Sequence, residues 1–148
     1  YEDMDEQKLV LDLNNNIPVG LEVLSARKLN EGDTPLNKIS FAKYLVGVEK
    51  KGECDLEKLM QNETLEVDKK TKKGITLTDI KPMINKISFL YEKDGKNYYE
   101  MLLSAGNIQN LKPETVVLAM EKYSDNFNAE FVTVKRLKMY FDEMKPIE

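Results

Sequence analysis

The side chains that most often carry enzyme chemistry are scarce in this sequence. Its 148 residues include no histidine and one cysteine, Cys54, whereas histidine supplies most proton transfer near neutral pH and most transition-metal ligands. Cys54 stands between Glu53 and Asp55, and two negative neighbours oppose formation of the reactive thiolate. The sequence therefore predicts no catalytic residue, no metal ligand and no cofactor-binding residue in this chain.

Two groups of basic residues could instead contact a phosphate backbone. The first is a cluster of four lysines, Lys69, Lys70, Lys72 and Lys73. The second is the adjacent pair Lys135 and Arg136. Lysine binds phosphate as a point charge, and arginine binds it as a two-pronged donor. The ordinary alternative is that both groups are solvated, because a basic hairpin tip protects a sheet edge and an outward pair on a strand faces water.

Composition limits the class of protein. A hydrophobic content of 41% over 148 residues is enough for one globular domain. The 26 acidic and 22 basic residues leave a net charge of −4, so the whole chain attracts neither nucleic acid nor an anionic membrane, and no DNA partner is expected. No apolar run approaches the roughly 18 residues of a membrane span. One cysteine forms no disulfide framework, which predicts a cytoplasmic location.

Residues 1–36 predict the end of an incomplete α/β unit. Apolar residues recur with helical spacing over residues 4–16, with Asp3 or Asp5 as the N-cap, and residues 21–29 predict a strand. A lone helix and strand cannot bury their apolar faces, so the earlier strands of this unit are expected to lie outside the sequence. The polar, breaker-rich residues 30–35 predict the boundary.

Residues 37–148 predict a ferredoxin-like α+β sandwich. A short helix is expected after Asp55, and another begins at Pro113, which suits a first helical turn. The predicted order is strand, helix, strand, strand, helix, strand (βαββαβ), with an extra hairpin before the central pair. The apolar alternation changes phase near Lys135, so a bulge is expected there. The predicted strands are residues 39–48, 64–67, 75–80, 86–92, 96–104 and 130–141.

The hairpin around Asp94 and Gly95 allows two registers. A two-residue loop sets Phe89 opposite Glu100 and mixes apolar with charged residues. A three-residue loop, residues 93–95 with Gly95 left-handed, gives one apolar face, and we prefer it. The preferred pairs are Ile87 with Met101, Phe89 with Tyr99, and Glu92 with Lys96.

The same hairpin contains aromatic residues that could stack on RNA bases, as sheet aromatics do in RNA-binding sandwiches. They are Tyr98, Tyr99 and Phe89. The preferred register turns Tyr99 and Phe89 toward the core. Tyr98 is therefore the predicted exposed stacking residue.

Four segments of the sequence together resemble a known family. They are residues 20–26 (GLEVLSA), 79–84 (DIKPMI), 110–114 (NLKPE) and 134–136 (VKR). In this order and spacing they are similar to the uncharacterised bacterial family called radical SAM-linked protein, or DUF2344, over essentially the whole chain. Members of that family have a further N-terminal segment, containing histidine, that this sequence lacks.

The resemblance implies association with a radical SAM enzyme, encoded beside such proteins or fused to them, and implies no catalytic residues. An iron–sulfur cluster of that class needs three closely spaced cysteines. S-adenosylmethionine and the cluster are therefore expected only in a partner or fused domain, because the chain has Cys54 alone.

The predicted function is a non-catalytic accessory or substrate-presenting module that works with a radical SAM protein, with RNA modification as the candidate process. One alternative is an independent RNA-binding protein connected with ribosome or transfer-RNA metabolism. The other is an enzyme whose catalytic groups lie in the missing N-terminal segment.

Overall fold

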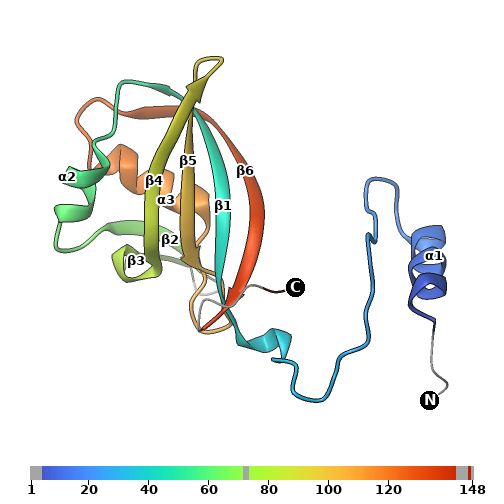
Figure 1. The fold of residues 1–148 in the computed structure, drawn as a ribbon. Coiled ribbons are helices and arrows are strands. Elements are labelled where there is room, and N and C mark those ends of the chain that lie inside the picture. Colours follow the sequence, from blue (N-terminus) through green and yellow to red (C-terminus); the bar gives the residue numbers. More distant parts are fainter. Residues whose placement is uncertain (1–4, 72–73, 143–146, 148) are drawn as a thin grey trace. The chain divides into compact units, whose positions relative to one another are not determined.

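The structure is a computed structural model that describes residues 5–71, 74–142 and 147 (Figure 1). Contacts divide the chain into two compact units, residues 1–34 and residues 35–148. Two lysines of the predicted four-lysine cluster, Lys72 and Lys73, lie outside the described residues.

The first unit consists of one helix and an extended segment. Helix α1 (Glu6–Asn16) begins after Asp5, whose side chain accepts a hydrogen bond from the Gln7 N–H at 2.9 Å. The strand predicted at residues 21–29 is wrong, because this segment forms no strand. Its backbone is held by side chains instead: Asn14 makes hydrogen bonds of 2.8 and 2.9 Å to the N–H and carbonyl groups of Val23.

The second unit is built on a four-stranded antiparallel sheet with strand order β4-β5-β1-β6. Its strands are β1 (Ile39–Lys51), β4 (Ile84–Lys93), β5 (Lys96–Ser104) and β6 (Asn128–Phe141). Helix α2 (Leu56–Gln61) follows β1, and α3 (Pro113–Lys122) follows β5. This order and connectivity are those of a ferredoxin-like sandwich, so the predicted fold class is confirmed.

The predicted extra hairpin is a second, two-stranded sheet of β2 (Glu66–Thr71) and β3 (Gly74–Asp79). It is attached to α3: the Lys122 ammonium donates to the Glu66 carbonyl oxygen at 2.7 Å, and the Glu66 N–H donates to the Tyr123 hydroxyl at 2.8 Å. The hairpin therefore continues the helical layer. Short 3₁₀ turns precede β1 (Leu36–Lys38) and β4 (Lys81–Met83).

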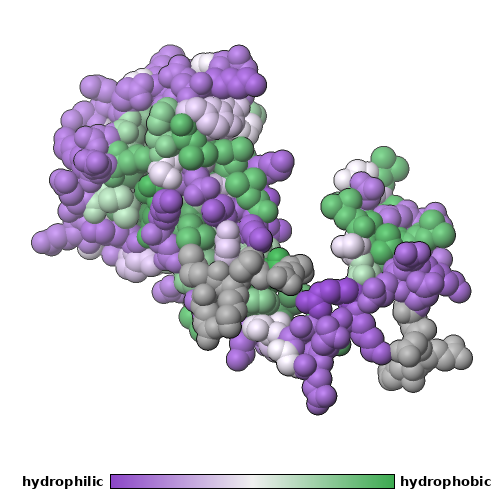
Figure 2. Space-filling view, in the orientation of Figure 1, coloured by the Kyte–Doolittle hydropathy of each residue, from purple (hydrophilic) through white to green (hydrophobic). Residues whose placement is uncertain are grey.

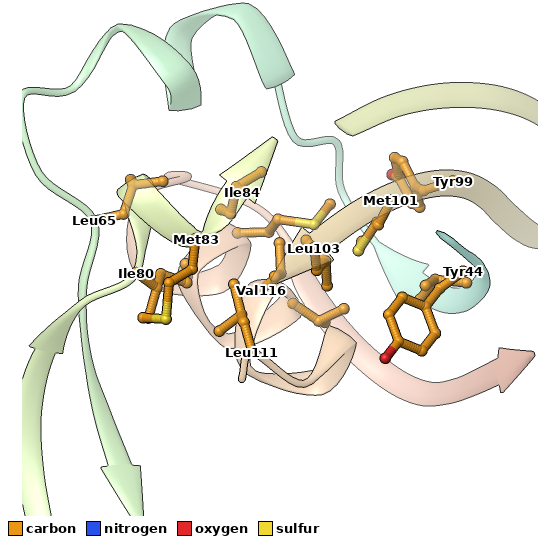
Figure 3. Packing of buried hydrophobic residues seen from close by; sticks show 14 of the residues in the cluster. Tyr44, Leu65, Ile80, Met83, Ile84, Tyr99, Met101, Leu103, Leu111 and Val116 are labelled. Atoms are coloured by element: carbon orange, nitrogen blue, oxygen red, sulfur yellow. The ribbon is translucent and has the colours of Figure 1, made fainter. Parts of the chain in front are cut away.

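The hydrophobic core lies between the sheet and this layer of α2, α3 and the hairpin. Side chains from β5, from α3 and from the segments flanking β2 and β3 meet there (Figure 3). Pro113 begins α3, as predicted, and the helix turns Val116, Val117 and Met120 inward. On the other face of the sheet, the described residues of the second unit form no helix or hairpin layer.

The β4–β5 hairpin corrects one prediction. Ile87 pairs with Met101 and Phe89 with Tyr99, as expected, but the loop is two residues long, with Asp94 at φ 53° and Gly95 at φ 74°. The expected pair of Glu92 with Lys96 is wrong, because Lys93 takes that place. The expected pairs of Ile87 and Phe89 occur together with a two-residue loop because the extra residue lies in a bulge inside β4, at Leu90, rather than in the loop.

Phe89 is a second correction, because its side chain is 51% exposed rather than buried in the core. Its strand β4 is at the edge of the sheet. The ring contacts Tyr99 edge-on with centroids 5.9 Å apart. Tyr99 itself is buried, as predicted.

Candidate nucleic-acid interface

The uncovered face of the sheet is defined by the alternation of residues along β1. Ala42, Tyr44, Val46 and Val48 are buried against the core, so the residues between them point to the other side. In Figure 1, β4 passes in front of α3, so this other side faces the viewer. Figure 2 shows apolar side chains over the middle of the sheet, bordered by hydrophilic ones.

Strand pairing places the side chains of this surface, which we call the open face, in rows across β4, β5, β1 and β6. The rows are Lys93, Lys96, Glu49 and Phe131; Tyr91, Tyr98, Gly47 and Thr133; Ser88, Glu100, Leu45 and Lys135; Lys86, Leu102, Lys43 and Lys138; and Ser104, Phe41 and Tyr140 on three strands.

The second row holds a stacked aromatic pair. The rings of Tyr91 and Tyr98 have centroids 4.8 Å apart and an interplanar angle of 26°. Tyr98 also leans over Gly47 on β1, where an added Cβ would come within 3.0 Å of its ring. The glycine thus makes room for the ring, and Tyr91 remains 45% exposed. The Tyr91–Tyr98 pair offers a stacking surface for a base.

A second aromatic side chain on the open face is Phe131, which is 56% exposed. The Lys96 ammonium lies 5.1 Å from the centroid of this ring. A cation beside an exposed ring can contact a phosphate while the ring contacts a base or sugar.

Positive charge is concentrated on the open face. Its rows contain six lysines and two glutamates, although the whole chain has a net charge of −4. The two glutamates are partly neutralised, since Glu100 pairs with Lys43 and Lys86 and Glu49 pairs with Lys96. The other three lysines form no ion pair within residues 5–71 and 74–142. They are Lys93, Lys135 and Lys138.

The structure separates the predicted pair Lys135 and Arg136. Lys135 lies opposite Leu45 on the open face, whereas Arg136 lies opposite Tyr44 on the covered face, where it is exposed at the edge of the sheet. The bulge expected near Lys135 is at Leu137, where the register shifts. Of the pair, Lys135 alone contributes to the open face.

The lysines of the β2–β3 hairpin lie in the other layer of the second unit. The Lys69 ammonium donates a hydrogen bond to the Asn110 carbonyl oxygen at 2.7 Å, and Lys70 is exposed opposite Ile75. Because the hairpin is attached to α3, the fold does not bring Lys69 and Lys70 together with Lys135.

Tyr98 lies on the open face as a half-buried stacking residue, and sequence reasoning missed most of its neighbours there. Those neighbours are Tyr91, Phe131, Glu100, Lys43, Lys86, Lys93, Lys96 and Lys138. The signal was the alternation of residues 96, 98, 100 and 102 along β5, which becomes a surface only when the strand order is known.

A polar cluster at the opposite side of the sheet includes the one cysteine. Burial raises the pKa of the Cys54 thiol, which accepts a hydrogen bond from the Ser124 hydroxyl at 3.2 Å. Burial also raises the pKa of Tyr99, whose hydroxyl accepts a 3.2 Å hydrogen bond from the Asn97 amide. A thiol held in its neutral form is a poor nucleophile, and Cys54 packs against the hydrophobic core.

Two further properties concern the described part of the chain. It contains no group of three or more histidine, cysteine, aspartate or glutamate side chains placed to hold a metal ion. None of its helices is both long enough and apolar enough to cross a membrane.

Comparison with known proteins identifies the family. The profile of the family described as "Uncharacterized protein conserved in bacteria (DUF2344)" matches residues 1–113. The chain belongs to this family. The match includes strands β1, β4 and β5 of the open face and ends at the start of α3. Neither a curated protein nor a solved structure matches the chain.

Proposed function

We propose that this DUF2344 protein is a non-catalytic, substrate-presenting module for a radical SAM enzyme and that it holds RNA on its open face. The observation that carries the proposal is the stacked pair Tyr91 and Tyr98 on a surface with six lysines. Exposed aromatics on a sheet stack on bases that are not paired, and lysines around them contact the phosphates.

Single-stranded RNA, or an unpaired loop, is the substrate that this geometry favours. The face spans four strands, and its aromatic side chains need unpaired bases on which to stack. Its excess of positive charge is local, because the chain as a whole is acidic. The residues outside the open face carry a net negative charge, which repels RNA from the rest of the surface and directs it to the open face.

The radical chemistry belongs to the partner in this proposal. The family resemblance supports that assignment, and so does the single cysteine of the chain, because the cluster of a radical SAM enzyme needs three. The two proteins would act together in the cytoplasm, with this chain supplying the RNA and the partner supplying S-adenosylmethionine and the cluster.

RNA binding is tested by fluorescence anisotropy with labelled single-stranded RNA at several salt concentrations. Lys135→Gln is expected to weaken binding several-fold and to lower the salt slope by about 1, as the loss of one phosphate contact does. The matched control is Arg136→Gln, one residue away on the covered face, which should leave both quantities unchanged. Equal losses in the two variants would contradict binding on the open face.

The partner half of the proposal needs a separate experiment. A radical SAM protein from the same cell, reconstituted with its cluster, is mixed with this chain and RNA, and modification of the RNA is followed by mass spectrometry. We expect modification that requires this chain and decreases with Lys135→Gln. Modification at the same rate without the chain would overturn the presenting role while leaving RNA binding intact.

A further inference from the structure

Glu100 occupies an unexpected position for an acidic residue on a surface that binds RNA. It lies on the central strand β5, one row from Tyr98 and between Ser88 and Leu45. A carboxylate at the middle of such a face repels phosphate. Its position next to the stacking pair therefore points to a role with the bases.

The two lysines around Glu100 hold its carboxylate in place without using all of its hydrogen-bonding capacity. The ammonium groups of Lys43 and Lys86 lie 3.5 and 3.9 Å from separate carboxylate oxygens, long for hydrogen bonds. A carboxylate has about four acceptor positions, and this one remains partly exposed to solvent. It can therefore accept hydrogen bonds from a ligand.

We infer that Glu100 reads the Watson–Crick edge of a guanine stacked beside Tyr91 and Tyr98. This inference rests on the proposed RNA-binding function. Guanine presents two adjacent donors, N1–H and the 2-amino group, which match the two oxygens of a carboxylate. Adenine and cytosine present one amino group beside an acceptor nitrogen, and uracil presents one N–H between two carbonyl oxygens that a carboxylate repels.

The spacing of the sheet is compatible with this contact. Residues two apart along a strand are separated by about 7 Å, which is comparable to the width of a purine. A base on the Tyr91–Tyr98 pair can thus direct its edge toward Glu100. Lys135, in the same row as Glu100, and Lys96, in the row beyond Tyr98, lie on either side of that base and can contact its flanking phosphates.

The test compares short single-stranded RNAs that differ at one central base within an otherwise uridine sequence. Guanosine is expected to bind roughly 10-fold more tightly than uridine. Inosine, which lacks the 2-amino group, should lose most of that advantage. In Glu100→Gln the guanosine preference should shrink to about 2-fold or less, because an amide offers one acceptor oxygen.

Glu49→Gln is the matched control. It removes the other negative charge of the open face, which pairs with Lys96, and should tighten binding to every RNA while the guanosine preference stays. If Glu100→Gln likewise tightens all RNAs equally and keeps the preference, Glu100 acts only through its charge and the inference is overturned.

The failure of this inference is distinguishable from failure of the proposed function. If the wild-type protein binds the RNAs equally tightly whichever of the four bases stands at the centre, the guanine assignment is overturned and RNA binding remains in place. Absence of binding to any of the RNAs at low salt would overturn the proposed function itself.

Discussion

The two faces of the sheet use the same strands for different purposes. On β1 and β5, every second residue, such as Val46 or Leu103, is buried under α3 and holds the unit together. The residues that alternate with them, such as Gly47 and Tyr98, form the open face. A single-residue step along either strand therefore moves from a position that determines stability to a position that we assign to binding.

This difference shows why charged residues gather on the open face, whereas on the covered face a charged residue such as Arg136 lies at the exposed edge of the sheet. On the covered face, an ionised group would lose its hydration, and the buried members of the core cluster are apolar or aromatic. On the open face, lysines keep their contact with water and cost little in the folded state. The sheet can therefore tolerate many substitutions on one face that it cannot tolerate on the other.

The largest expected effect separates the faces by stability. Leu103→Ala removes a side chain that is 0% exposed, so we expect the free energy of unfolding to fall by about 2–5 kcal/mol. Leu45→Ala, on the open face opposite Glu100, should cost clearly less because its side chain is only partly buried. Urea denaturation of both variants measures the difference, and equal losses would show that the open face is buried in the folded protein.

Gly47→Ala tests how the open face is assembled. The new Cβ would lie 2.6 Å from the Thr133 Oγ1 and 3.0 Å from the Tyr98 ring, so one of these groups must move, at a cost of roughly 1 kcal/mol or more. We expect RNA affinity to fall with stability, because the displaced ring belongs to the stacking pair.

The double variant Gly47→Ala/Thr133→Ala provides the control for that prediction. It removes the closest contact but keeps the clash with Tyr98. Stability should recover in part while RNA affinity stays low. Full recovery of affinity would assign the effect to Thr133 and would remove Tyr98 from the binding surface.

Local chemistry was sufficient to predict most elements of the second unit, although the strand predicted at residues 64–67 is β2 at Glu66–Thr71, so that Lys69 and Lys70 lie in the strand rather than the turn. Asp55 caps α2, accepting hydrogen bonds from two backbone N–H groups at 3.0 and 3.1 Å, and Pro113 begins α3. Both signals depend on neighbours within a few residues of the chain. The fold class followed from the order of elements along the chain, since βαββαβ units have few ways to close a sheet.

The errors arose where distant segments decide the outcome. The segment at residues 21–29 has the composition of a strand but no partner strand among the described residues of its unit. The apolar pairing of β4 with β5 leaves one residue of β4 unpaired. Nothing near the turn distinguished a three-residue loop from a two-residue loop with a bulge at Leu90. The partition of Lys135 and Arg136 between faces likewise depends on pairing with β1.

The smallest expected effect concerns alkaline pH and the covered side of the sheet. Burial raises the pKa of the Cys54 thiol above its usual value of 9.0 and also raises the pKa of Tyr99. A raised pKa in the folded state means that folding favours the protonated form. The corresponding stability is fully present below the usual pKa and is lost as pH rises through the folded value.

We therefore expect the free energy of unfolding to decrease above about pH 9, and the decrease to be shallower in Cys54→Ala, which removes one of the titrating groups. Ser124→Ala should make it steeper, because the Ser124 hydroxyl lowers the pKa of Cys54 and so opposes the effect of burial. Urea denaturation at a series of pH values measures all three proteins. If the three curves are parallel, the thiol titrates alike in the folded and unfolded chains, and burial on the covered side does not extend to Cys54.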